Sequence, residues 1–275
     1  MESLLALAKS FHKGFYVYRS KSDCLRVLRA TQKLSLPWWN RRCTEFVETL
    51  ESSIESVTDA SFSSGTRQPI IVLEGLDGVG KTLISHTLAS KLEGIPLHTP
   101  PSEWSDIRPL FLNQDNALLR AFYSGSNYIA ASGILHAAQE RVVVLDRWWC
   151  STCAMALANQ FTTRTLPPEG DAVYEWPSDL PKPNVGFYIF VDEQVRRARI
   201  RKRAPEDSEE QRLSAESEMR AAAAEAYRRT HLLHPIEAPN YRAAVNSILA
   251  FLTERGILHS GVPFTDSELR EISSF

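Results

Sequence analysis

The sequence has few cysteines, no long hydrophobic run and no excess of charge of one sign. Its 275 residues include only four cysteines, too few for the disulfide framework of a small secreted protein. No apolar stretch approaches the ~18 residues that a membrane-spanning helix needs. Lys and Arg number 31 and Asp and Glu 33, so the overall charge gives no reason to expect nucleic acid or a membrane as a partner. We therefore expect a protein of a reducing compartment, with 43% hydrophobic residues to build one sizeable core.

Acidic residues are scarce at the start of the chain, where the first 43 residues hold nine Lys or Arg and only two acids. This composition is typical of an organelle transit peptide, and equally of the basic face of two short folded helices. Apolar residues recur at steps of three and four from Cys43 to Val57, with Asn40 as the expected N-cap. We assign residues 1–67 to a helical N-terminal segment and a linker, which is rich in Ser and Gly at 61–66.

Strands and helices are expected to alternate after residue 68, which favours an α/β domain at 68–257 and a C-terminal tail at 258–275. The expected strands are Ile70–Leu73, Val142–Leu145, Val185–Val191 and Leu232–Ile236. The expected helices are Lys81–Leu92, Asp115–Glu140, one after Trp149, Glu193–Arg203, Ser208–Arg229 and Tyr241–Arg255. This order predicts a parallel sheet with helices on both faces.

A glycine-rich turn follows the first expected strand and fits the pattern G-x-x-x-x-G-K-[ST] of a phosphate-binding loop. It reads Gly75-Leu76-Asp77-Gly78-Val79-Gly80-Lys81-Thr82. In this pattern main-chain N–H groups and the start of the next helix converge on phosphate oxygens. Lys81 supplies a positive charge for the outer phosphates, and the Thr82 hydroxyl is a ligand for Mg²⁺. The loop therefore predicts an ATP site.

Asp77 is an acid inside a loop that binds phosphates, where its charge needs a reason. One interpretation is that it accepts a hydrogen bond from a sugar hydroxyl of a second nucleotide. The other is that it stabilises the turn itself.

Three further stretches resemble the thymidylate-kinase-like nucleoside monophosphate kinases. They are Val142-Val143-Val144-Leu145-Asp146-Arg147-Trp148, Leu180-Pro181-Lys182-Pro183-Asn184, and Val191-Asp192-Glu193 with the arginines that follow. Within this family the sequence is most similar to the mitochondrial UMP–CMP kinase type, through the stretches Arg120–Tyr128, Asp146–Thr152 and Val173–Leu180. The resemblance covers residues 70 to 255 and implies a P-loop NTPase fold, three-layer α/β/α with a five-stranded parallel sheet.

The resemblance assigns roles to residues that would hold the acceptor nucleotide. It places Tyr123 under the acceptor base and puts Asn127 where thymidylate enzymes carry a base-reading Arg. An amide offers both a donor and an acceptor, so Asn127 could pair with uracil or cytosine. The alternative is that Tyr123 and Asn127 only line a helix interface. Arg147 is expected to grip the acceptor phosphate, and Asp146 to orient Mg²⁺ or its water.

The sequence departs from the family in two places. Trp148 stands where a Tyr is usual, so a hydroxyl contact is lost there. The acceptor loop at 98–103 lacks the Arg that thymidylate enzymes carry after the proline, and Arg108 or Arg120 is expected to replace it.

Six of the eight residues from Arg196 to Arg203 are Lys or Arg. Such a run could be a nuclear signal, a nucleic-acid patch or a solvated helix face. The resemblance instead makes it the helix that carries the lid arginines, and Arg199 and Arg203 are expected to reach the transferring phosphate.

The function that follows is transfer of the ATP γ-phosphoryl group to UMP, CMP, dUMP or dCMP, with ATP and Mg²⁺ as cofactors; a dTMP kinase is the nearer alternative. The resemblance suggests a homodimer through the long helices. It also suggests a mitochondrial location, with the cytoplasm as the alternative location. Two more distant interpretations remain at this point. Trp149-Cys150-Ser151-Thr152-Cys153 has the W-C-x-x-C spacing of a thioredoxin-like dithiol, and the P-loop could belong to an ATP-binding regulatory protein.

Overall fold

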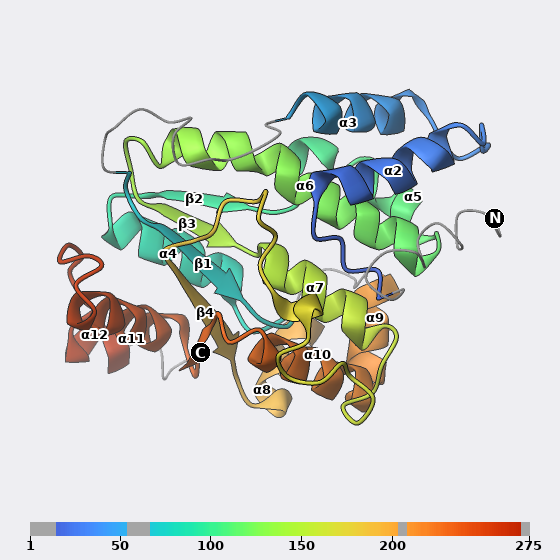
Figure 1. Ribbon diagram of the computed structural model, residues 1–275. Coiled ribbons are helices and arrows are strands. Elements are labelled where there is room, and N and C mark those ends of the chain that lie inside the picture. Colours follow the sequence, from blue (N-terminus) through green and yellow to red (C-terminus); the bar gives the residue numbers. More distant parts are fainter. Residues whose placement is uncertain (1–14, 54–66, 203–207, 271–275) are drawn as a thin grey trace.

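The centre of the molecule is a five-stranded, all-parallel sheet with the strand order β2-β3-β1-β4-β5 (Figure 1). The computed structural model describes residues 15–53, 67–202 and 208–270. The strands are β1 (Ile70–Glu74), β2 (Ile95–His98), β3 (Val143–Asp146), β4 (Val185–Phe190) and β5 (His234–Glu237). The predicted α/β class and the five-stranded parallel sheet are confirmed. The strand β2 was not found from the residues because its side chains are only half-buried at the sheet edge, which leaves no apolar run.

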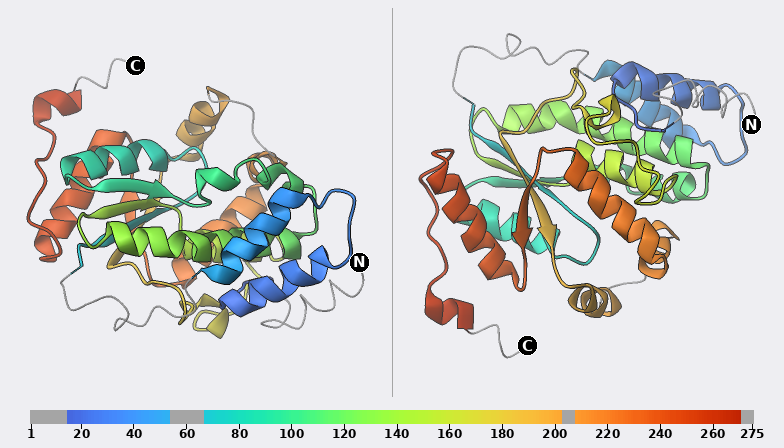
Figure 2. Two further views of the ribbon diagram at one scale, coloured as in Figure 1. Left: turned by 90° about the horizontal axis from the view of Figure 1, so that it is seen from above. Right: turned by 60° about the horizontal axis from the view of Figure 1, so that its bottom comes forward.

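Helices cover both faces of the sheet and make two separate cores. One core lies between the sheet and the helices α4 and α11. The other core lies between the opposite face of the sheet and the helices α6, α7 and α10. Both layers are visible in Figures 1 and 2. The helices are α2 (Lys21–Gln32), α3 (Arg41–Ser52), α4 (Lys81–Lys91), α5 (Arg108–Leu112), α6 (Asn116–Ala137), α7 (Trp149–Ala158), α8 (Glu193–Arg201), α9 (Ser208–Ala215), α10 (Ser217–Arg229), α11 (Tyr241–Glu254) and α12 (Asp266–Arg270).

Capping side chains fix several helix starts. Asn40 accepts from the Cys43 amide at the start of α3, as predicted, and Asp115 does so from Ala117 at the start of α6. The single helix expected over 208–229 is wrong, because Glu216 has extended backbone angles and divides it into α9 and α10. The predicted linker at 61–66 lies outside the described residues.

The N-terminal helices α2 and α3 pack against α6 and share its hydrophobic core. Figure 2 shows these blue helices lying alongside the green α6. From Ala117 to Tyr128 every residue of α6 except Tyr123 is buried, so this half of the helix has contacts on all sides. A homodimer through the long helices, which stays a prediction, would therefore have to use another part of α6.

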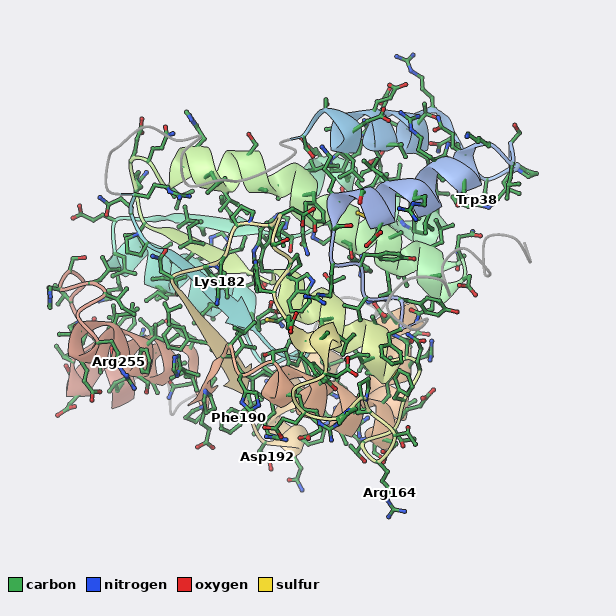
Figure 3. All side chains as sticks on the ribbon, in the orientation of Figure 1. Trp38, Arg164, Lys182, Phe190, Asp192 and Arg255 are labelled. Carbon is green, nitrogen blue, oxygen red and sulfur yellow. The ribbon has the colours of Figure 1, made fainter. Side chains whose placement is uncertain are left out.

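The charged side chains lie mainly at the periphery, as Arg164, Asp192 and Arg255 do in Figure 3. Within 15–53, 67–202 and 208–270, no helix combines the length and apolar character needed to cross a membrane.

Candidate active site

The phosphate-binding loop connects β1 to α4, at the carboxyl edge of the sheet where ligands of open α/β folds bind. Gly75 has φ 141°, and a Cβ there would lie 2.3 Å from the Ile189 carbonyl oxygen of β4. Only glycine fits this close approach. Lys81 Nζ turns back into the loop and donates to the Leu76 carbonyl at 2.8 Å. The predicted strand–loop–helix context of the motif is thus present.

Lys81 is buried, with 5% of its surface exposed. Burial lowers the pKa of its ammonium group to about 8, and the nearby charge of Arg147 contributes to the shift. At a pH between about 8 and the ordinary pKa of 10.5, Lys81 is less often protonated in the folded protein than in the unfolded chain. Its cation is complete below pH 8 and is lost as the pH rises through 8.

We therefore expect ATP binding to take up a proton above about pH 8, because phosphate charge favours the ammonium form. Calorimetry of ATP binding in two buffers with different ionisation enthalpies measures this uptake. Lys81→Met should remove the buffer dependence. A wild-type binding enthalpy that is equal in both buffers at about pH 8.5 would contradict the assignment.

A cavity, here called the phosphate cleft, lies beside the phosphate-binding loop. Its wall includes Lys81, Thr82, Asp146 and Arg147. Thr82 Oγ1 donates to Asp146 Oδ2 at 2.7 Å. The other carboxylate oxygen, Oδ1, is buried without a hydrogen-bond partner. An orphaned carboxylate oxygen beside a hydroxyl is the donor set that Mg²⁺ prefers. The predicted pair Thr82 and Asp146 therefore fits a divalent cation.

Arg147 follows β3 directly, in an unusual backbone conformation. Its φ is 70°, a left-handed value that costs a non-glycine residue about 1–3 kcal/mol. The guanidinium forms an ion pair with Asp77 and donates to the Gly75 carbonyl. The side chain that sequence reasoning assigned to the acceptor phosphate thus lies against the phosphate loop.

A buried network missed by sequence reasoning holds Arg147 in place. Glu74, the last residue of β1, accepts from the amides of Trp148 and Ser151 at 3.0 and 3.1 Å. The Ser151 hydroxyl contacts Glu74, Arg147 and the hydroxyl of Tyr227. Burial raises the pKa of Glu74 to about 7. An acid at the end of an apolar strand was the only sequence signal for this network.

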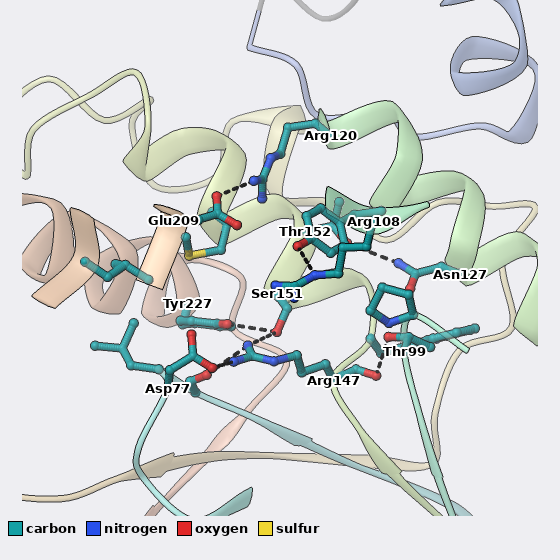
Figure 4. Close-up of a pocket in the computed structure, with 17 residues that line it drawn as sticks. Asp77, Thr99, Arg108, Arg120, Asn127, Arg147, Ser151, Thr152, Glu209 and Tyr227 are labelled. Atoms are coloured by element: carbon teal, nitrogen blue, oxygen red, sulfur yellow. Dashed lines mark hydrogen bonds and ion pairs between the residues drawn. The ribbon is translucent and has the colours of Figure 1, made fainter. Parts of the chain in front are cut away.

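A cavity of about 270 Å³ opens beside Arg147 (Figure 4). This volume lies just below the ~300–1,000 Å³ range of small-molecule pockets. The cavity contains all six residues predicted for the acceptor and several that were not predicted. Its lining includes Asp77, Thr99, Arg108, Arg120, Tyr123, Asn127, Arg147, Ser151, Thr152, Glu209 and Tyr227.

Two arginines lie against the ring of Tyr123 in this cavity. Arg108 Nε donates to the Tyr123 hydroxyl at 2.9 Å, and the Arg120 guanidinium lies 5.0 Å from the ring centroid. Arg120 is buried and forms an ion pair with Glu209 of α9. A buried guanidinium needs such a counter-charge.

Asn127 and Trp148 use their polar groups within the protein. Asn127 Nδ2 donates to Thr152 Oγ1 at 3.1 Å, at the wall of the cavity (Figure 4). Trp148 Nε1 donates to the Pro181 carbonyl, so the group that replaces the usual Tyr hydroxyl holds the loop before β4.

The arginines of α8 make internal contacts. Arg196 is buried and donates to the Asp77 carbonyl, and Arg199 donates to the carbonyls of Val79 and Pro239. These contacts hold both guanidinium groups against the phosphate-binding loop and the end of β5. Arg199 also lines the phosphate cleft. Arg203 lies outside the described residues.

The Cys150 and Cys153 thiols do not have the properties of a catalytic dithiol. Both are buried, and burial raises the pKa of each. A reactive dithiol needs access and a lowered pKa. The thioredoxin-like interpretation is therefore wrong.

Comparison with known proteins agrees with this geometry. The family model described as thymidylate kinase matches residues 73–248. The chain belongs to the thymidylate kinase family. This span begins near the end of β1, includes the whole phosphate-binding loop and extends into α11.

Two known proteins are similar to this chain, one in sequence and one in structure. The mitochondrial UMP-CMP kinase 2 of Homo sapiens is 31% identical over 218 residues, which are 76% of this chain and 48% of that protein. The chain thus spans about half the length of this relative. A solved thymidylate kinase from Candida albicans superimposes with a TM-score of 0.54 at 16% identity, covering 70% of this chain and 95% of that one. This likeness supports the fold.

Proposed function

We propose that the chain transfers the γ-phosphoryl group of ATP to a pyrimidine nucleoside monophosphate, namely UMP, CMP, dUMP or dCMP. The observation that carries this proposal is the meeting of two cavities. The acceptor cavity and the phosphate cleft share Asp77 and Arg147 in their walls. Two nucleotides bound in them would face each other with their phosphates.

The donor side combines the phosphate cleft with a third cavity beyond Gly80. That cavity is lined by apolar parts of Leu83, Val195 and Tyr241, and it suits the adenine ring. Leu83 is half-exposed, at 53%, which leaves an apolar surface for a flat base to cover. Lys81 and the amides of the loop hold the outer phosphates, and Arg199 lies between the two cavities.

Thr82 and Asp146 would hold Mg²⁺ at the donor phosphates. The metal supplies charge neutralisation of the phosphate oxygens when it is bound. The chain's own part is to orient Thr82 and Asp146 by their mutual hydrogen bond.

On the acceptor side Tyr123 stacks on the base, Asn127 faces the base edge and Arg147 grips the phosphate. Arg108 and Arg120 add positive charge in the same cavity. The acceptor phosphate has a second pKa near ~6 and is mostly ionised at neutral pH, so no general base is needed. The chemical problem is to align two polyanions, and cations fixed around them solve it.

The choice of base depends on Asn127. Its amide already contacts Thr152 and keeps a carbonyl oxygen that can accept from a base. The similarity to a protein named UMP-CMP kinase supports uracil and cytosine. A dTMP kinase is the alternative, supported by the family match.

Asn127→Arg is expected to move preference toward dTMP, because a guanidinium replaces the amide at the base edge. The change is measured as the ratio of kcat/KM for UMP to that for dTMP, which should fall by ~10-fold or more. Thr152→Ala, which removes only the amide's partner, should move the ratio less. An unchanged ratio in Asn127→Arg would exclude Asn127 as the base-reading residue.

A coupled ADP-release assay with UMP, CMP, dUMP, dCMP and dTMP tests the proposal directly. Acceptor-dependent ADP release with the first four supports it. A rate with dTMP that exceeds the others would favour the alternative, and ATP binding without any acceptor-dependent release would make the chain a regulatory ATP-binding protein.

We propose that the protein is located in mitochondria, which the name of the human relative supports. The proposed partners are small nucleotides, with no role for nucleic acid or a membrane.

A further inference from the structure

The helices α2 and α3 contribute no residue to the wall of the acceptor cavity or the phosphate cleft. They nevertheless pack on the stretch of α6 that carries Arg120, Tyr123 and Asn127. We infer that α2 and α3 are a positioning element for the acceptor site, which fixes the base-binding residues through the back of α6. This inference rests on the proposed function, because it gives the N-terminal helices a role in acceptor binding.

The helix α3 approaches the backbone of α6 closely at Gly125. An ideal Cβ at Gly125 would lie 2.9 Å from Leu50 Cδ2 and 3.3 Å from the Phe46 ring, so α3 lies directly on the α6 backbone. Phe46 also packs against Phe122, with ring centroids 5.1 Å apart. A methyl group at 125 would press on the Leu50 side chain and the Phe46 ring, so this contact between α3 and α6 would have to shift to admit it.

Polar contacts attach the N-terminal segment to the two ends of the same stretch. Tyr18 donates to the Ala117 carbonyl in the first turn of α6, at 2.9 Å. Asp179 accepts from the Tyr128 hydroxyl with one oxygen and from the Lys21 amide, at the start of α2, with the other. Ala117 and Tyr128 bracket the acceptor residues, and Tyr128 is adjacent to Asn127.

The geometry of a helix turns these contacts into a positioning role. Tyr123 and Asn127 are four residues apart and share one face, whereas Gly125 is about 200° away from Tyr123 around the axis. The helix α6 is therefore held between α3 on one side and the cavity on the other. Because a helix moves as a rigid body, a shift at Gly125 is transmitted to Tyr123 and Asn127. Misplacement by ~1 Å can lower a catalytic rate by ~10²-fold.

Gly125→Ala tests the inference with a single methyl group, and Gly133→Ala is its matched control. Gly133 lies on the same helix, and a Cβ there has no atom within 4 Å. Both changes raise helix propensity equally. We expect Gly125→Ala to raise the KM for UMP or CMP by ~10-fold with the KM for ATP unchanged. Gly133→Ala should leave both values as in the wild type.

Leu50→Ala combined with Gly125→Ala should bring the acceptor KM back toward the wild-type value, because the contacted methyl is removed. If Gly125→Ala does not fold, Tyr128→Phe provides the second test, since it breaks one bond to Asp179 and should raise the acceptor KM alone. The inference is overturned if these variants change both KM values equally, or lower only thermal stability.

The wild-type protein separates the two proposals. If the wild type phosphorylates pyrimidine monophosphates and the variants keep its acceptor KM, only the positioning role is wrong. If the wild type releases no ADP with any of these acceptors, the proposed function is wrong and the positioning role is lost with it.

Discussion

Replacing Lys81 by alanine is expected to lower kcat by ~10³-fold or more. Lys81 is the cation buried at the centre of the phosphate loop, where its ammonium contacts the Leu76 carbonyl. In a site shielded from water one fixed charge acts strongly on phosphate oxygens. The measurement is UMP-dependent ADP release at saturating ATP, together with calorimetry of ATP binding.

Lys91→Ala is the control for Lys81→Ala. Lys91 lies at the other end of the same helix, over the ring of Phe264 at 4.1 Å. Its removal should leave turnover unchanged. Full activity of Lys81→Ala, with a folded protein by circular dichroism, would overturn the assignment of the loop as the donor site.

Replacing Arg147 by alanine is expected to lower kcat/KM for the acceptor by ~10³-fold, with a smaller effect on ATP binding. Arg147 is the cation shared by the two cavities. Its loss would remove the phosphate contact proposed for it, and it removes the positive charge paired with the Asp77 carboxylate beside incoming phosphates. Arg147→Lys keeps the charge without the fork geometry and should recover only part of the loss. Steady-state kinetics with varied UMP at saturating ATP measures these effects.

The pairing of Arg147 with Asp77 makes a double-mutant cycle informative. Asp77→Asn should partly restore acceptor binding in Arg147→Ala, because it removes the repulsion left by the first change. If the two effects are simply additive, the ion pair plays no part in acceptor binding. The single variant Asp77→Asn also distinguishes the two interpretations of Asp77. If Asp77 binds a sugar hydroxyl, Asp77→Asn alone should weaken acceptor binding.

The position of α2 and α3 gives the N-terminal segment a physical context that the sequence lacked. The basic composition of the first 43 residues is typical both of a transit peptide and of the basic face of folded helices. From residue 15 to 53 the chain is folded onto α6 and shares its core. Lys21, one of those basic residues, is buried, and its ammonium donates to carbonyls at the end of α3.

The sequence by itself determined the features whose signals are contiguous. The phosphate loop, the strands β1, β3 and β4, and Arg147 directly after β3 lie where the residues predicted them, because local propensity and a strict motif decide such segments. Asn40 capped its helix for the same reason. The edge strand β2 was not seen, since its side chains are only half-buried and leave no apolar run.

Only the tertiary structure decided which distant residues share the site. Glu209 reaches Arg120 across 89 positions of sequence, and Ser151 meets both Glu74 and Tyr227 across 77 and 76. The break at Glu216 that separates α9 from α10, and the seat of Leu50 on Gly125, are equally invisible in the residue order. Such contacts depend on the order of the strands in the sheet and on how the helices pack on it, and no local spacing encodes that arrangement.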